Sequence, residues 1–184
     1  MDVRQLIVVA VALIVLLGIA WVFVRKQRTM NLQKRFGPEY DRAVGEIGQQ
    51  RAESALLERE KRVQEFSLRE LSAEEREGFV SEWRMVQTRF VDDPQAAVGD
   101  ADLLVDRLMQ ERGYPMSNFE QRAADISVSH PTVVSNYRAA HQIAVRHSQG
   151  QATTEDLRNA IIHYRSLFEE LLRKGSSTHK KEVA

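Results

Sequence analysis

Histidine and carboxylate side chains are the residues of this chain that could bind a metal or transfer protons. The sequence contains five histidines and no cysteine. A di-iron site in a helical bundle needs Glu-x-x-His, and no histidine has a glutamate three residues before it. The signatures of a phosphate-binding loop, a dinucleotide site, a serine hydrolase and a zinc protease are also absent from the sequence. We therefore expect no catalytic residue, no cofactor and no metal, and we predict that the protein is not an enzyme.

His141 is the histidine whose position can be interpreted most directly. It lies on the apolar face of a predicted helix, together with Tyr137 and Ala144. A lone imidazole in an apolar core cannot complete the coordination of a metal, and its neutral form needs one hydrogen-bond partner. We expect a buried, neutral His141 with one hydrogen bond to the backbone.

Four other residues leave an alternative open. Asp92 and Asp93 precede Pro94, where an aspartate commonly caps a helix, and His130 precedes a proline in a predicted turn or cap. The capping interpretation explains these residues without any ligand. The competing hypothesis is an enzyme with a dispersed active site around Asp92, Asp93, Asp125 and His130.

The charges are distributed unevenly along the chain. The totals are 26 basic and 26 acidic residues, but residues 37–172 contain 16 basic against 24 acidic ones. Residues 25–36 contain five basic residues and no acid. An acidic body repels the phosphates of nucleic acids, so we expect no nucleic acid as a partner.

Residues 6–24 form an uninterrupted apolar run of 19 residues without a charge, an amide or a hydroxyl group. As a helix this run is roughly 28 Å long, close to the thickness of the hydrocarbon core of a bilayer. It is too long for the apolar part of a signal peptide and no small-residue cleavage site follows it, so we predict an uncleaved transmembrane helix. Trp21 is expected at the interface.

The basic residues after this run predict its orientation. By the positive-inside rule, the segment 25–36 places the C-terminal body in the cytoplasm and residues 1–5 outside. The predicted location is the inner membrane of a bacterium, crossed once. Arg25, Lys26 and Arg28 could also contact anionic lipid, although setting the topology is a sufficient role for them.

The body is predicted to be all-α, because apolar residues recur with a period near 3.6 and no alternation of period 2 is sustained. A charged helix from Pro38 to Phe66 is expected to form a solvated strut within residues 37–70. Residues 71–173 are expected to form a bundle of about five helices, and residues 174–184 a disordered tail.

Capping signals and apolar stripes define the helices of the bundle. Capping boxes are expected at Ser72 and Ser117, and caps at Asp93 and at Thr153 or Thr154. A further helix is expected to start at His130-Pro131, and Gly113 is the expected residue after a helix end. The inward side chains are predicted to be Phe79, Trp83, Val86, Phe90, Ala97, Ala101, Leu104, Val105, Leu108, Phe119, Ala123, Ile126, Val134, Tyr137, Ala140, His141, Ala144, Val145, Leu157, Ile161, Tyr164, Phe168 and Leu171.

Several stretches have the character of family motifs. They are RFGPEYDRAV at 35–44, RFVDDP at 89–94, RGYP at 112–115, FEQRAAD at 119–125 and HYRSLF at 163–168. Together with the N-terminal apolar run, the chain resembles a family of small bacterial single-pass membrane proteins without an assigned activity. The resemblance covers nearly the whole chain beyond residue 24, and it implies the architecture but no site residues.

The leading functional hypothesis follows by elimination. An anchor, a strut and a capped helical bundle without a catalytic set are typical of a scaffold or a protein-interaction module, so we predict a protein partner in addition to the bilayer at residues 6–24. The alternatives are the enzyme with a dispersed site and a peripheral lipid-sensing module that uses the basic segment 25–36 together with the basic C-terminal tail.

Overall fold

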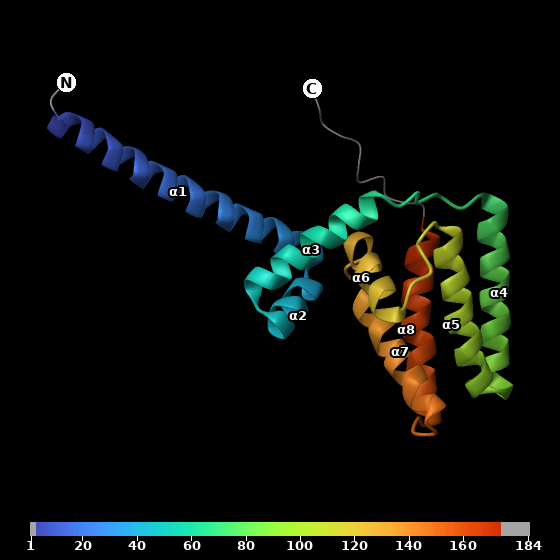
Figure 1. Cartoon of the computed structure of the whole chain (residues 1–184). Coiled ribbons are helices and arrows are strands. Elements are labelled where there is room, and N and C mark those ends of the chain that lie inside the picture. The colour runs from blue at the N-terminus through green and yellow to red at the C-terminus, as the bar shows by residue number, and fades with distance from the viewer. Residues whose placement is uncertain (1–2, 174–184) are drawn as a thin grey trace. The chain divides into compact units, whose positions relative to one another are not determined.

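The computed structural model describes residues 3–173, with the side chains of residues 3–12 and 14 excepted. This part of the chain consists of eight helices and contains no strand, which confirms the predicted all-α class (Figure 1). The predicted tail, residues 174–184, lies outside the described residues. The chain divides into two compact units, residues 1–56 and residues 57–184, and each is described by itself.

The first unit begins with α1, a helix of 34 residues from Val3 to Phe36. This helix contains both the predicted apolar span and the basic segment 25–36 without interruption. In the part of the chain with described side chains, no helix is long and apolar enough to cross a membrane. The side chains of residues 6–12 and 14 of the predicted span lie outside that part.

The prediction of one helix over residues 38–66 is wrong. The structure has α2 (Pro38–Ile47) and α3 (Gln49–Gln64), separated at Gly48. Gly48 has φ +80°, a left-handed conformation that glycine adopts without the steric cost of a Cβ atom. The boundary of the compact units falls within α3.

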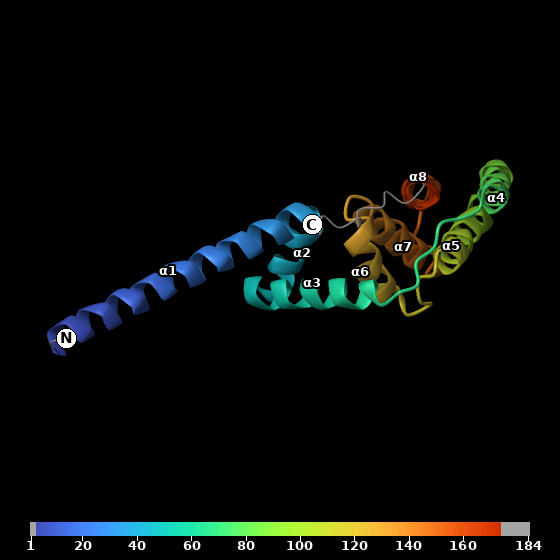
Figure 2. The ribbon, with the colours of Figure 1, turned by 90° about the horizontal axis from the view of Figure 1, so that it is seen from above.

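Hydrogen bonds to one carboxylate connect the helices of the first unit. The Oε1 atom of Glu53 on α3 accepts from Thr29 Oγ1 of α1 at 2.8 Å and from the Tyr40 hydroxyl of α2 at 3.1 Å. Figures 1 and 2 show α2 and the first turns of α3 beside the C-terminal end of α1. The buried apolar residues of this unit are Leu32, Phe36, Tyr40, Ala43, Ala52 and Leu56.

The second unit contains the five helices of the predicted bundle. They are α4 (Ala73–Asp92), α5 (Pro94–Glu111), α6 (Phe119–Ser129), α7 (Val134–Ser148) and α8 (Thr154–Leu172). The helices α4 and α5 lie side by side, as do α7 and α8, and α5 also packs on α8 and α7 (Figure 1). The apolar cores of the two helix pairs therefore meet along α5 and α8.

Local capping interactions begin three of these helices as predicted. Ser72 and Thr153 form capping boxes with Glu75 and Asp156, and the Asp93 side chain accepts from the Ala96 N–H. Each cap supplies an acceptor for backbone N–H groups that the first turn of a helix leaves unpaired.

Two predicted helix starts are wrong by a few residues. Asn118, and not Ser117, caps α6 by accepting from the Gln121 N–H. His130-Pro131 forms a turn between α6 and α7, because the His130 N–H still bonds to the last turn of α6 and the Val133 N–H bonds back to the His130 carbonyl. The helix α7 therefore begins at Val134.

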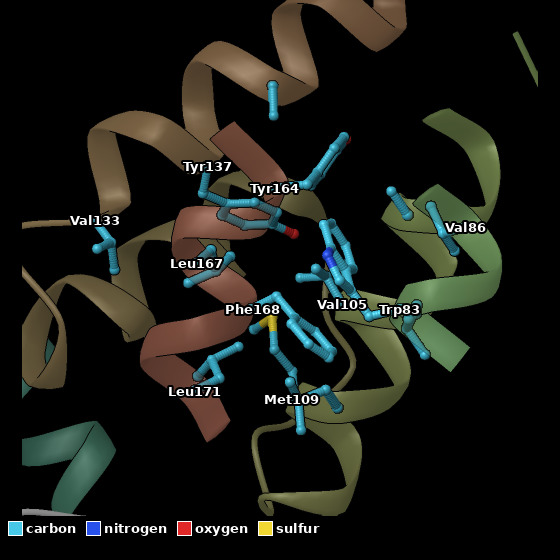
Figure 3. Close-up of a cluster of buried hydrophobic side chains, with 14 of the residues drawn as sticks. Trp83, Val86, Val105, Met109, Val133, Tyr137, Tyr164, Leu167, Phe168 and Leu171 are labelled. Atoms are coloured by element: carbon cyan, nitrogen blue, oxygen red, sulfur yellow. The ribbon is translucent and has the colours of Figure 1, made fainter. Parts of the chain in front are cut away.

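Aromatic side chains fill the core between α4, α5, α7 and α8 (Figure 3). Trp83 of α4 stacks on Phe168 of α8 with 4.7 Å between the ring centroids. Tyr137 and Tyr164 are completely buried. Most predicted core positions are confirmed; Val145 is 41% exposed instead, and Ile143 on the same helix is buried.

Candidate functional site

The structure does not assemble the residues of the dispersed-site hypothesis. Asp93 caps the start of α5. His130 lies near the other end of α5. Its side chain contacts Glu170 of α8. The next residue of α8, Leu171, accepts a hydrogen bond through its carbonyl from Arg112, which follows the last residue of α5. The 18 residues of α5 separate these ends by about 27 Å.

The remaining members of that hypothesis are an exposed helix-end residue and a buried carboxylate with structural partners. Asp92 is the exposed last residue of α4. Asp125 is 2% exposed, and its Oδ1 atom accepts from Arg62 at 2.7 Å and from Gln121 at 2.8 Å. Among the described residues, no group of three histidine, aspartate or glutamate side chains is placed to hold a metal ion.

His141 is partly buried and not fully enclosed as expected. Its ring stacks on Phe119 with 3.6 Å between the ring centroids. The prediction was a hydrogen bond to the backbone, and the interaction in the structure is this ring contact. Burial lowers the pKa of His141, so the ring is neutral at neutral pH.

A polar cluster that the sequence analysis missed connects four helices of the bundle. We call Asp102, Asp106, Arg122, Tyr137 and Tyr164 the polar cluster. The Tyr164 hydroxyl donates to Asp102 at 2.8 Å, and Arg122 donates to the Tyr137 hydroxyl at 3.2 Å. Arg122 also pairs with Asp106 at 3.3 Å.

The electrostatics of the polar cluster favour a structural role. Burial and the nearby aspartates raise the pKa values of Tyr137 and Tyr164, and burial raises the pKa of Asp106. A general acid or base needs a pKa near the working pH, and the shifts move both tyrosines further from neutrality, whereas the shift of Asp106 is toward it. Asp106 is paired with Arg122, and the hydrogen bonds and this ion pair connect α5, α6, α7 and α8.

The second feature that the sequence analysis missed is an apolar groove between α4 and α5, which we call the α4–α5 groove. It has a volume of about 630 Å³. Met85 of α4, Leu103 of α5 and Met116 line it and are 62%, 64% and 48% exposed, whereas Val86 and Leu104 beneath them are buried. Figures 1 and 2 show α4 and α5 side by side along this length.

Two ion pairs connect α4 to α5 at the groove. Arg107 donates to both carboxylate oxygens of Glu82, at 2.6 and 3.0 Å. Arg89 donates to Asp100 at 2.6 Å. Glu82 and Arg89 are seven residues apart on α4, a distance of about 10.5 Å along the helix axis. The exposed side chains of Met85 and Leu103 thus lie in a segment about two helical turns long with balanced charge at its edges.

The comparisons with known proteins give no further identification. No family model, curated protein or solved structure matches this chain.

One sequence signal for the groove does exist. Leu103, Leu104 and Val105 are consecutive, and a helix that buries one face cannot bury three consecutive side chains equally. Such a run shows that an apolar side chain lies off the core face, but not which one. The position of Met116 beside it depends on the loop between α5 and α6 and has no local signature.

Proposed function

We propose that this chain is a single-pass membrane protein whose cytoplasmic bundle binds an amphipathic helix of a partner protein in the α4–α5 groove. The observation that carries the binding function is the set of exposed apolar side chains Met85, Leu103 and Met116 over a buried apolar floor. Contiguous exposed apolar surface with polar edges is typical of protein interaction sites.

The dimensions of the groove favour a helix as the occupant. Anchor residues at i, i+3 or i+4, and i+7 of a docked helix span about 10.5 Å, the same length as the groove segment between its two ion pairs. Methionine side chains at two of the three exposed positions adapt to differently shaped apolar anchors. The paired charges at the edges suit a partner helix whose flanking residues carry both signs.

The membrane part of the proposal is supported by the exposure of side chains on α1 and by the sequence of this helix. Leu16, Leu17 and Ile19 point in different directions around the helix, and all three are more than 60% exposed. Apolar side chains on every side of a helix are stable in lipid and unfavourable in water. The run of 19 apolar residues and the five basic residues after it support a bacterial inner-membrane location with the body in the cytoplasm.

The experiment compares two aspartate substitutions in the full-length tagged chain, purified from detergent-solubilised membranes. Leu103→Asp puts a charge in the α4–α5 groove, and Val91→Asp puts the same charge on α4 at a side chain that is 80% exposed and does not line the groove. The proposal predicts a co-purifying protein that is retained by the wild type and by Val91→Asp and lost from Leu103→Asp.

Equal recovery of every co-purifying protein by the two variants would show that the groove is not the binding surface. Recovery of a second, differently tagged copy of this chain that is lost only from Leu103→Asp would assign the groove to self-association instead of a partner protein.

A further inference from the structure

A second pocket lies within the first unit, between α1 and α3. It has a volume of about 340 Å³, at the small end of the range for ligand sites. Four of its lining residues come from α1 and three from α3: Trp21, Val24, Arg25, Arg28, Gln50, Glu53 and Ser54.

The two arginines of this pocket are available for an anion. Within the described residues, neither Arg25 nor Arg28 forms an ion pair within 4 Å of a carboxylate, whereas Arg42 of the same unit pairs with both Glu39 and Glu46. Arg25 is nevertheless close enough to Glu53 to interact with it electrostatically. The Arg25 guanidinium lies 5.4 Å from the centre of the Trp21 ring, a cation–π contact that restricts its position. Arg25 and Arg28 are three residues apart, so they project from the same side of α1.

Glu53 gives the pocket one acceptor beside these two cations. Its Oε1 atom accepts from Thr29, Tyr40 and Gln49, and no described residue donates to its Oε2 atom. Burial would raise the pKa of Glu53, but the hydrogen bonds from Gln49, Thr29 and Tyr40 and the positive charge of Arg25 outweigh it and leave the pKa below its ordinary value. Glu53 is therefore ionised, and the pocket carries two positive charges and one negative charge.

The position of the pocket along α1 relates it to the proposed membrane anchor. The apolar run ends at residue 24, and Arg25 and Arg28 are within about 6 Å of that end along the helix axis. In an anchored chain this is the level of the phospholipid phosphates, where a tryptophan is also favoured.

We propose that this pocket binds the headgroup of an anionic phospholipid with a free hydroxyl group, as in phosphatidylglycerol. Arg25 and Arg28 donate hydrogen bonds to the phosphodiester, a pairing that guanidinium geometry favours. A headgroup hydroxyl donates to Glu53 Oε2. The net charge of the pocket complements the single negative charge of such a lipid, and a choline headgroup has no donor for Glu53.

The inference rests on the proposed membrane anchor, but not on the α4–α5 groove. The test is native mass spectrometry of the full-length chain in detergent, with phosphatidylglycerol or phosphatidylcholine added as the probe. Arg25→Gln with Arg28→Gln removes both pocket cations. Lys26→Gln with Lys34→Gln removes the same charge from the same basic segment at positions outside the pocket lining.

The expected result is retention of one phosphatidylglycerol by the wild type and by the lysine variant, with about tenfold or greater loss of that complex in the arginine variant. Equal loss in both variants overturns the proposal, because it would show a diffuse charge effect. Equal retention of phosphatidylcholine by the wild type also overturns it.

Two further measurements separate the remaining explanations. Displacement of the lipid by millimolar glycerol phosphate overturns the lipid assignment in favour of a free phosphate ester. Membrane fractionation of the arginine variant separates this inference from the anchor: a variant that stays in the membrane but no longer retains lipid supports the pocket, whereas a wild-type chain found outside the membrane removes the basis of both.

Discussion

Trp83 is the residue whose substitution most directly tests the packing of the bundle. Its side chain is 5% exposed and stacks on Phe168 between α4 and α8. Trp83→Ala should lower the free energy of unfolding by about 3–5 kcal/mol, because it removes a large buried ring and leaves a cavity. The measurement is urea unfolding followed by circular dichroism.

Val91→Ala is the control for this prediction, because Val91 lies on the same helix and is 80% exposed. It should change the free energy of unfolding by less than about 0.5 kcal/mol. A Trp83→Ala effect as small as that of Val91→Ala would mean that Trp83 is not part of the core.

Gly113 occupies a position where the backbone conformation and the surrounding atoms leave no room for a side chain. It has φ +90°, and a Cβ atom there would lie 2.5 Å from the Ser67 carbonyl oxygen. The approach is fixed by the hydrogen bond from the Arg69 N–H to the Arg112 carbonyl. Gly113→Ala should destabilise the chain by more than about 1 kcal/mol, through backbone strain and this close contact.

Gly99→Ala is the matched comparison within α5, since a Cβ atom at Gly99 meets no atom within 4 Å. Alanine is the better helix former by about 1 kcal/mol, so this substitution should stabilise the chain. Thermal unfolding of the two variants should therefore shift in opposite directions, and a shift in the same direction would contradict the placement of Gly113.

His130 makes the stability of the bundle depend on pH. Burial lowers the pKa of His130 despite its contact with Glu170, and burial lowers the pKa of His141 in the same way. In the unfolded chain the histidine pKa is about 6.5, so as the pH falls the unfolded chain binds protons at a higher pH than the folded chain does. Stability is complete above about pH 6.5 and falls as the pH decreases below it.

His130→Gln should reduce this slope, and His130→Gln combined with His141→Gln should reduce it further, in urea unfolding series between about pH 7.5 and pH 5.5. A wild-type stability that rises on acidification over this range would show that the histidines are favoured in the charged form and would contradict their burial.

At the scale of the helices, the sequence predicts most boundaries wherever the signal is local. Ser72, Asp93 and Thr153 each cap a helix through a backbone N–H group three residues away, so the pattern contains both partners of the interaction. The apolar stripes of α4, α5 and α8 are predicted for a related reason, because the helical period alone decides which side chains share a face.

The failures at the same scale depend on longer-range structure. Gly48 ends α2 inside a charged sequence that continues to favour a helix. The break is accompanied by hydrogen bonds from Thr29 of α1 and Tyr40 of α2 to Glu53 of α3, which are contacts between different helices. Pro131 can start a helix or occupy a turn, and the His130 N–H bond to α6 selects the turn. The polar cluster and the α4–α5 groove each need residues from separate helices or a loop, so the spacing in the sequence could not predict them.

At the scale of the whole molecule, the charge distribution leads to a prediction about topology. Five basic residues follow the apolar run, so the positive-inside rule places the body in the cytoplasm. A fluorescent reporter that matures only in the cytoplasm should be bright when fused after Ala184, and alkaline phosphatase fused there should be inactive. Active phosphatase would contradict the orientation.

Charge reversal at Arg25, Lys26 and Arg28 is the control for this topology measurement. The reversal removes the excess of positive charge that keeps this segment on the cytoplasmic side of the bilayer. Part of the population should then insert in the opposite orientation, so that both the fluorescent reporter and the phosphatase are partly active. Unchanged signals would show that another part of the chain determines the orientation.

The central claim is that the α4–α5 groove holds an amphipathic helix of a partner protein, and site-specific photocrosslinking in intact membranes tests it most directly. A photoreactive amino acid at position 103 lies in the groove, and one at position 91 lies on α4 outside the groove lining. The account predicts one adduct, formed at position 103 and not at 91, whose crosslinked peptide has apolar residues at i, i+3 or i+4, and i+7. An adduct with a second copy of this chain, or the same adducts from both positions, would contradict it.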